Sequence, residues 1–107
     1  MSQIAYTVTV TLPDEATARD WLRWLTGGHI DDVLAAGASD AELVQLDEAG
    51  HSFAVRYHFA SAEAFADYER DYAPRLRAEG LRLFPVEKGV AYRRCVGTVM
   101  GSWLADR

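Results

Sequence analysis

His29 is the residue whose type and position best suit chemistry. It directly follows Gly27 and Gly28, which should interrupt a helix and leave the imidazole beside a cavity. Because an imidazole titrates near neutral pH and suits proton transfer, His29 is the candidate catalytic residue. The alternative is structural: the ring caps the first helix or hydrogen-bonds a carbonyl at the Gly-Gly turn.

Arginines on predicted strands are the candidate anion ligands. Arg56, Arg93 and Arg94 lie on strands that are neighbours in many sheets of the expected kind. Two converging guanidinium groups can hold a carboxylate or phosphate through paired hydrogen bonds. We therefore expect Arg56 and Arg93 to bind an anionic ligand. The alternative is that these arginines pair with acidic residues of the sheet or of a second subunit.

Large aromatic residues are the expected walls of a ligand cavity. Trp21, Trp24, Tyr57 and Phe65 fall on apolar faces of predicted helices and strands, and small-molecule sites are mostly apolar with a few polar groups. We assign these four residues to ligand binding. A tyrosine in such an apolar register is also suited to the core, with its hydroxyl hydrogen-bonded.

Composition and motifs exclude several classes of protein. The 107 residues carry a net charge of −5, which repels nucleic acid and anionic membranes. The single cysteine cannot form an intramolecular disulfide, and His51 and His58 point to opposite faces of one strand, so we predict no metal site. No cofactor-binding motif, signal peptide or membrane span is recognisable. We expect a cytoplasmic chain that needs no cofactor.

Alternating and helical patterns predict the elements of the first half. Residues Ile4–Leu12 alternate as a strand, and Pro13 and Asp14 then mark a helix start. The helix carries Trp21 and Trp24, breaks at the two glycines, and is followed by a short helical segment that Gly37 ends.

The second half is expected to contain two strands, a helix and a last strand. Strands are expected at Glu42–Asp47 and Ser52–Phe59, joined by a short loop ending in Gly50. Ser61 is a good N-cap for the next helix, which Pro74 should kink or divide, with a second piece closed by Gly80. A last strand is expected at Lys88–Met100.

This order of elements is that of an α+β, ferredoxin-like β-α-β-β-α-β domain spanning residues 1–107. Two helices should cover one face of a four-stranded antiparallel sheet and leave the other face open. The open face is expected to carry small and polar side chains, among them Thr7, Thr9, Ala54, Arg56, His58, Ala91 and Arg93.

Three segments resemble a known family. The runs WLRWLTGGHIDDVLAAG at 21–37, YAPRLRAEGL at 72–81 and YRR at 92–94 are similar to the bacterial domain-of-unknown-function family 4286. The resemblance implies a place in the dimeric α/β-barrel superfamily, whose protomers set their sheets face to face, and hence a homodimer. It implies no activity, because cofactor-independent monooxygenases, polyketide cyclases, haem-degrading enzymes and stress proteins share that fold.

Two functions remain open, and the sequence does not decide whether the chain is an enzyme. The favoured one is a small-molecule binder or cofactor-independent enzyme acting on a small aromatic or anionic compound, which predicts a cavity of roughly 300 Å³ or more. The other is a non-enzymatic homodimeric interaction or regulatory module with a filled core. An RNA-binding sheet is disfavoured, because the aromatic residues fall on the face that the helices should cover.

Overall fold

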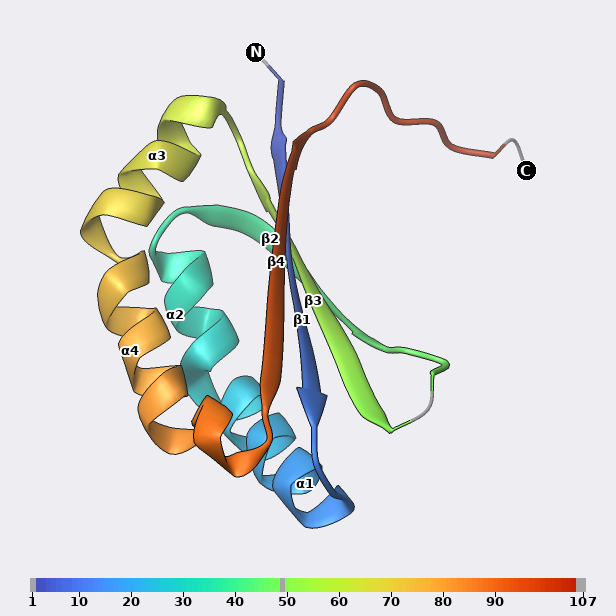
Figure 1. The fold of residues 1–107 in the computed structure, drawn as a ribbon. Coiled ribbons are helices and arrows are strands. Elements are labelled where there is room, and N and C mark those ends of the chain that lie inside the picture. Colours follow the sequence, from blue (N-terminus) through green and yellow to red (C-terminus); the bar gives the residue numbers. More distant parts are fainter. Residues whose placement is uncertain (1, 49, 106–107) are drawn as a thin grey trace.

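Four strands form one antiparallel sheet in the computed structural model, which describes residues 2–48 and 50–105 (Figure 1). The order in the sheet is β2-β3-β1-β4, so β2 and β4 are the edges. The strands are β1 (Ile4–Leu12), β2 (Ala38–Gln45), β3 (His51–Phe59) and β4 (Ala91–Thr98). The predicted α+β ferredoxin-like arrangement is confirmed.

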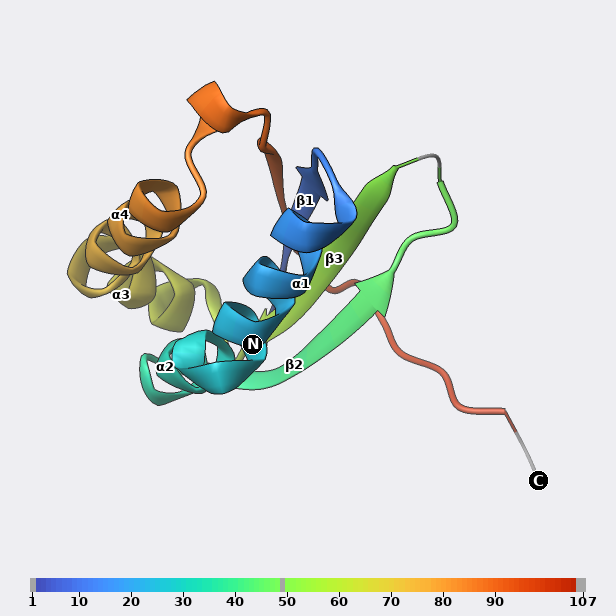
Figure 2. The ribbon, with the colours of Figure 1, turned by 90° about the horizontal axis from the view of Figure 1, so that it is seen from below.

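The helices all cover one face of this sheet (Figure 2). They are α1 (Glu15–Trp24), the π-helical turn η1 (Leu25–His29), α2 (Ile30–Ala35), α3 (Ala62–Asp71), α4 (Ala73–Leu83) and the 3-10 turn η2 (Val86–Lys88). None of the described helices is long and apolar enough to cross a bilayer.

The helices between β1 and β2, which are α1, η1 and α2, begin and bend where predicted. Asp14 caps α1, its carboxylate accepting a hydrogen bond from the Thr17 amide at 2.7 Å. At η1 the backbone leaves helical geometry only at Gly28, which has a φ of 153°. Because that conformation strongly favours glycine, Gly28 sets the bend that carries His29 to the start of α2.

Pro74 divides the helices between β3 and β4 as predicted, whereas Gly80 does not end the second of them. Ser61 caps α3, and Pro74 lies in the first turn of a separate helix, α4, where a proline is tolerated. The prediction that Gly80 closes this helix is wrong, because α4 continues to Leu83. Gly80 instead allows close packing: a Cβ there would lie 3.2 Å from Cη2 of Trp24.

The largest differences from the predicted strand bounds are in β2 (Ala38–Gln45, predicted Glu42–Asp47) and β4 (Ala91–Thr98, predicted Lys88–Met100). β2 begins earlier, at Ala38, which pairs with Phe59 ahead of an irregularity in the register. β4 is shorter than expected, because Gly89 has a φ of 93° after η2 and the strand starts only at Ala91. Gly50 has the positive φ expected of the hairpin loop, and Ala49 of that loop lies outside the described residues.

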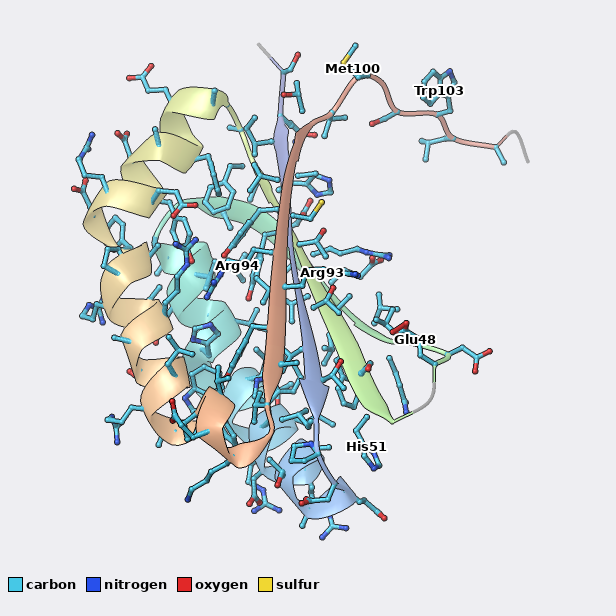
Figure 3. The ribbon with its side chains drawn as sticks, viewed as in Figure 1. Glu48, His51, Arg93, Arg94, Met100 and Trp103 are labelled. Atoms are coloured by element: carbon cyan, nitrogen blue, oxygen red, sulfur yellow. The ribbon has the colours of Figure 1, made fainter. Side chains whose placement is uncertain are left out.

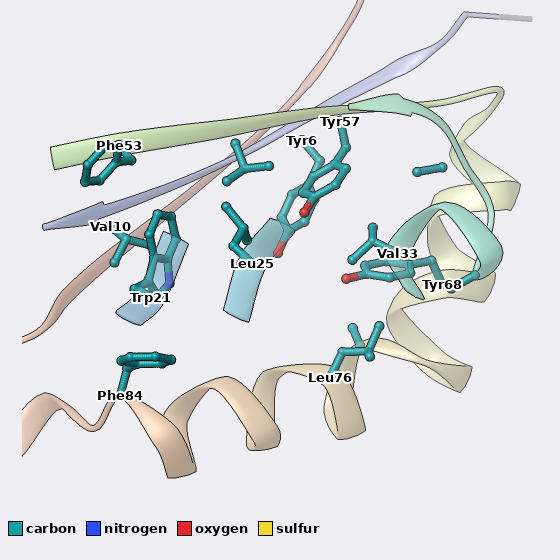
Figure 4. Packing of buried hydrophobic residues seen from close by; sticks show 14 of the residues in the cluster. Tyr6, Val10, Trp21, Leu25, Val33, Phe53, Tyr57, Tyr68, Leu76 and Phe84 are labelled. Carbon is teal, nitrogen blue, oxygen red and sulfur yellow. The ribbon is translucent and has the colours of Figure 1, made fainter. Parts of the chain in front are cut away.

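The core fills the space between the sheet and the helices (Figure 4). The apolar face of β1 and β3 meets Trp21 and Leu25 from α1 and η1, and Tyr68 and Leu76 from α3 and α4. Phe59 is fully buried and packs edge-on against Phe65 at 5.1 Å between ring centroids. The buried side chains of the described residues form one cluster.

Candidate functional site

A pocket of about 60 Å³ lies between the sheet and the two helical layers. We call it the helix-side pocket, and its aromatic and charged walls are Tyr6, Trp21, Trp24, His29, Tyr57, Tyr68, Arg77, Tyr92 and Arg94. A water molecule needs roughly 10–15 Å³ by such a measure, so the pocket has room for a few waters. The prediction of a cavity of about 300 Å³ is therefore wrong for this conformation.

Most of the predicted site residues lie together at this pocket. His29, Trp21, Trp24 and Tyr57 all line it, although they come from η1, α1 and β3. Phe65 does not line the pocket. Its ring packs against Tyr6, which does line the pocket, at 5.3 Å between ring centroids.

Arg56 and Arg93 lie on the opposite face of the sheet. Strand alternation points them away from the helices, and Figure 3 shows Arg93 and Arg94 leaving β4 on opposite sides. Arg56 Nη1 lies 3.6 Å from Glu42 Oε1, which is the acidic pairing considered as its alternative role. Neither arginine reaches the helix-side pocket.

Arg77 and Arg94 take the place expected for Arg56 and Arg93. Arg77 projects from α4, and its Nη2 donates to the Tyr6 hydroxyl at 3.0 Å and lies 2.8 Å from Glu69 Oε2. Its Nε is buried and has no hydrogen-bond partner. Arg94 reaches the pocket from β4, and none of the described carboxylates lies within 4.0 Å of its guanidinium. The pocket thus holds two cations and an unused donor.

Three buried tyrosines, Tyr6, Tyr57 and Tyr68, line the pocket. Tyr6 and Tyr57 stack at 6.0 Å between ring centroids, and Tyr68 lies 6.2 Å from Tyr6 (Figure 4). Burial raises the pKa of the Tyr57 hydroxyl and raises the pKa of Tyr68 to about 12. These hydroxyls stay protonated at neutral pH and can act as hydrogen-bond donors or acceptors to a ligand.

His29 is held by stacking. Its ring lies 4.2 Å from the Trp24 ring, and Trp24 Nε1 donates to Glu79 Oε1 at 3.3 Å. His29 makes no side-chain cap at the start of α2, and among the described residues no hydrogen bond involves its ring. Burial lowers the pKa of His29, against the opposing effect of Asp32 and Glu79. The neutral imidazole can therefore accept a proton at neutral pH.

Metal ligands are not gathered at this site. Across residues 2–48 and 50–105, no group of three or more histidine, cysteine, aspartate or glutamate side chains is placed to hold an ion.

Arg77 is the pocket residue that the sequence reasoning missed. Its signal was helical spacing, because Ala73, Arg77 and Gly80 share the inward face of α4.

The family follows from the sequence of almost the whole chain. The family described as "Domain of unknown function (DUF4286)" matches residues 3–99. The chain belongs to this family. No curated protein matches this DUF4286 chain in sequence.

Solved structures with the same fold are numerous and distant in sequence. A dimeric ferredoxin-like protein from an uncultured marine organism has a TM-score of 0.75 at 8% identity, covering 96% of the DUF4286 chain and 100% of its own. A monooxygenase from the gene ActVA-Orf6 of Streptomyces coelicolor, in complex with nanaomycin D, has a TM-score of 0.73 at 19% identity. The match covers 98% of the DUF4286 chain and 94% of the monooxygenase chain. The cofactor-independent oxygenase SnoaB from Streptomyces nogalater has a TM-score of 0.63 at 11% identity, covering 95% and 97%. These similarities show the ferredoxin-like fold.

Proposed function

We propose that this chain binds a small aromatic compound with an acidic oxygen in the helix-side pocket and acts on it without a cofactor. The observation that carries the proposal is the buried, unpartnered Nε of Arg77 in a pocket walled by aromatic rings. A buried N–H without a partner is costly, and a ligand oxygen that accepts its hydrogen bond removes this cost.

The charges of the pocket favour an anion. Glu69 already pairs with Arg77, so the second cation, Arg94, supplies the excess positive charge. A carboxylate or phenolate between the two guanidinium groups would make charge-assisted hydrogen bonds. The rings of Trp24, Tyr57 and Tyr92 would contact the apolar part of the ligand.

His29 gives this pocket a base. Its neutral imidazole is suited to accept a proton from an acidic O–H or C–H group of the bound compound. The two arginines would then stabilise the negative charge left on the ligand. Structural neighbours named as a monooxygenase and a cofactor-independent oxygenase support a reaction of this kind on the same fold.

Ligand binding requires the pocket to widen, because about 60 Å³ does not hold an aromatic ring. The wall formed by η1 is the part best able to move. Neither Gly27 nor Gly28 would bring a Cβ within 4 Å of another group, so open space surrounds both glycines. A shift of η1 would carry His29 and the stacked Trp24 outward together.

Calorimetric titration with benzoate and 1-naphthoate, and with neutral benzamide as the comparison, tests the proposal. We expect the carboxylates to bind more tightly than benzamide, and Arg94→Met to weaken carboxylate binding by roughly tenfold or more. Arg82→Met removes an exposed arginine from the same helix as Arg77 and should leave the affinity unchanged.

Two results would contradict the proposal. One is equal affinity for benzoate and benzamide in the wild-type chain. The other is a loss of carboxylate binding in Arg93→Met but not in Arg94→Met, which would place the ligand on the open face. If His29→Ala abolishes a measured turnover while preserving carboxylate binding, the assignment of His29 as the base is supported.

A second proposed function is pairing of two copies through the open face of the sheet. This face carries small side chains around Cys95, which is exposed and lies opposite Thr7 in the register. Small residues allow another sheet to approach closely, and two of the structural neighbours are named as dimeric. In this proposal the dimer forms through the open face, and a ligand can still bind in the helix-side pocket of each copy.

Sedimentation equilibrium tests the pairing. We expect a dimer, and Cys95→Arg should weaken it by roughly tenfold or more, because it places an unpaired charge of each copy on the face that pairs. Ala78→Arg, on the exposed side of α4, is the matched control and should leave the dimer intact. A wild-type chain that sediments as a monomer would refute the pairing.

A further inference from the structure

The segment that follows β4 is unusually apolar and exposed. We call residues 99–105 the tail. Met100, Trp103 and Leu104 are 93%, 87% and 97% exposed, although side chains of these types normally gain free energy by burial. The Trp103 ring folds over Gly101 of the same tail, where a Cβ would lie 2.7 Å from its Cη2.

The tail projects away from the helices. Figures 1 and 2 show it leaving the end of β4 on the side of the open face. The amide of Val99 donates to the Gln3 carbonyl at 2.9 Å, which fixes the point of departure beside β1. Beyond that point the exposed apolar side chains extend in the direction that a second copy would occupy in the face-to-face pairing.

A shallow groove lies at the opposite end of the open face. We call it the sheet-face groove, and it has a volume of about 200 Å³ between Thr9, Thr11, Ala91, Arg93 and Glu48. Ala91 is the first residue of β4, whereas the tail follows Thr98, the last. Figure 3 shows Glu48 and Arg93 on the open face and Met100 and Trp103 at the end where the tail leaves.

We propose that the tail of one copy lies across the open face of a second copy and places its Trp103 ring in the partner's sheet-face groove. This inference rests on the face-to-face pairing proposed above. A two-fold axis perpendicular to the strands brings each tail over the end of the sheet that holds the partner's groove. Both tails then make the same contact, so the interface closes as a dimer.

Length and chemistry both agree with this placement. The five residues from Val99 to Trp103 reach about 17 Å when extended, and four neighbouring strands span about 14 Å, so Trp103 can reach across the partner's sheet. Arg93 has no carboxylate within 4.0 Å among the described residues, and its guanidinium can lie over an indole face. Tryptophan and arginine are the residues that most often dominate protein interfaces.

Disulfide trapping tests the contact directly. With Cys95→Ser, the chain has no other cysteine, so Ser102→Cys on one tagged copy and Ala91→Cys on an untagged copy can be mixed, exchanged and mildly oxidised. We expect a mixed disulfide dimer, because the two positions flank Trp103 and Arg93 and a disulfide requires close approach of its Cβ atoms. Val86→Cys in place of Ala91→Cys is the matched control, on an exposed residue of η2, and should form none.

Sedimentation equilibrium of shortened chains separates the tail from the pairing. A chain that ends at Val99, and full-length Trp103→Ala, should each weaken the dimer by roughly tenfold or more, whereas Val86→Ala should not. If the wild-type chain is a dimer and neither change weakens it, the tail contact is refuted and the pairing stands. If the wild-type chain is monomeric, both are refuted.

Discussion

Replacing Arg77 by methionine tests whether its partly buried guanidinium serves a ligand or the fold. Methionine keeps a long, flexible side chain on α4 and removes all charge and hydrogen bonding. The change deletes the bond from Nη2 to the Tyr6 hydroxyl at 3.0 Å and the ion pair with Glu69 at 2.8 Å. It also deletes the buried Nε that has no partner.

These contributions nearly cancel in the stability of the chain without ligand. One hydrogen bond to Tyr6 is worth about 1 kcal/mol, and a partly exposed ion pair such as Arg77–Glu69 adds at most about 1 kcal/mol. Removing an unsatisfied buried donor returns about 1–3 kcal/mol. We therefore expect the free energy of unfolding of Arg77→Met to lie within about 1 kcal/mol of wild type.

Ligand binding should respond much more strongly. A hydrogen bond between a guanidinium and a carboxylate is worth about 1.5–3 kcal/mol, so Arg77→Met should weaken benzoate binding by about 10- to 100-fold. Arg77→Lys keeps the charge but has no Nε, and it should recover only part of the affinity.

The assays are urea unfolding followed by circular dichroism and calorimetric titration with benzoate, on the same protein preparations. A loss of more than about 2 kcal/mol in the free energy of unfolding, with benzoate affinity unchanged, would refute the reasoning. Arg77 would then be a structural link between α4 and β1.

Three further predictions concern the backbone, His29 and Tyr92. Gly28→Ala should destabilise the chain by about 1–2 kcal/mol because of its φ of 153°, whereas Gly27→Ala should be neutral or stabilising. Urea unfolding of the two variants measures this difference, and equal effects on the free energy of unfolding would contradict the prediction. Burial lowers the pKa of His29 in the folded state, so the unfolded chain binds more protons below pH ~6.5. The free energy of unfolding of wild type should therefore fall more than that of His29→Gln between pH ~7.5 and ~5.5. Parallel curves of unfolding free energy against pH for the two proteins would argue against this. Tyr92→Phe removes the bond from its hydroxyl to the Phe84 carbonyl at 2.6 Å and should cost about 1 kcal/mol by thermal unfolding, and an unchanged Tm would show that water replaces this bond.

The order and faces of the elements were predictable because they depend on local patterns. Alternation over Ile4–Leu12 and the caps at Asp14 and Ser61 act within a few residues of the chain. The end of α4 was not predictable in this way. Gly80 has the local signature of a helix end, but the Trp24 ring packed against it gives the glycine a different role, and the helix continues to Leu83.

The site was only partly predictable, because its residues meet through tertiary packing. His29 and Trp24 are close in sequence, and their stacking follows from the bend at Gly28. Arg77 lies far from both along the chain and reaches the pocket only because α4 packs beside η1 across the sheet. Helical spacing within α4 places Arg77 on the inward face, but it cannot show that its Nε is buried without a partner, because that depends on those tertiary contacts.

The difference between Arg93 and Arg94 shows how one step in strand register separates the two proposed functions. Consecutive side chains of a strand point to opposite faces, so Arg94 enters the helix-side pocket and Arg93 the sheet-face groove. As an edge strand, β4 gives each guanidinium access to solvent and to an incoming group on its own face. A ligand on one face and a second copy on the other can therefore be tested with the two neighbouring substitutions Arg94→Met and Arg93→Met. The first should weaken benzoate binding, and the second should weaken the dimer.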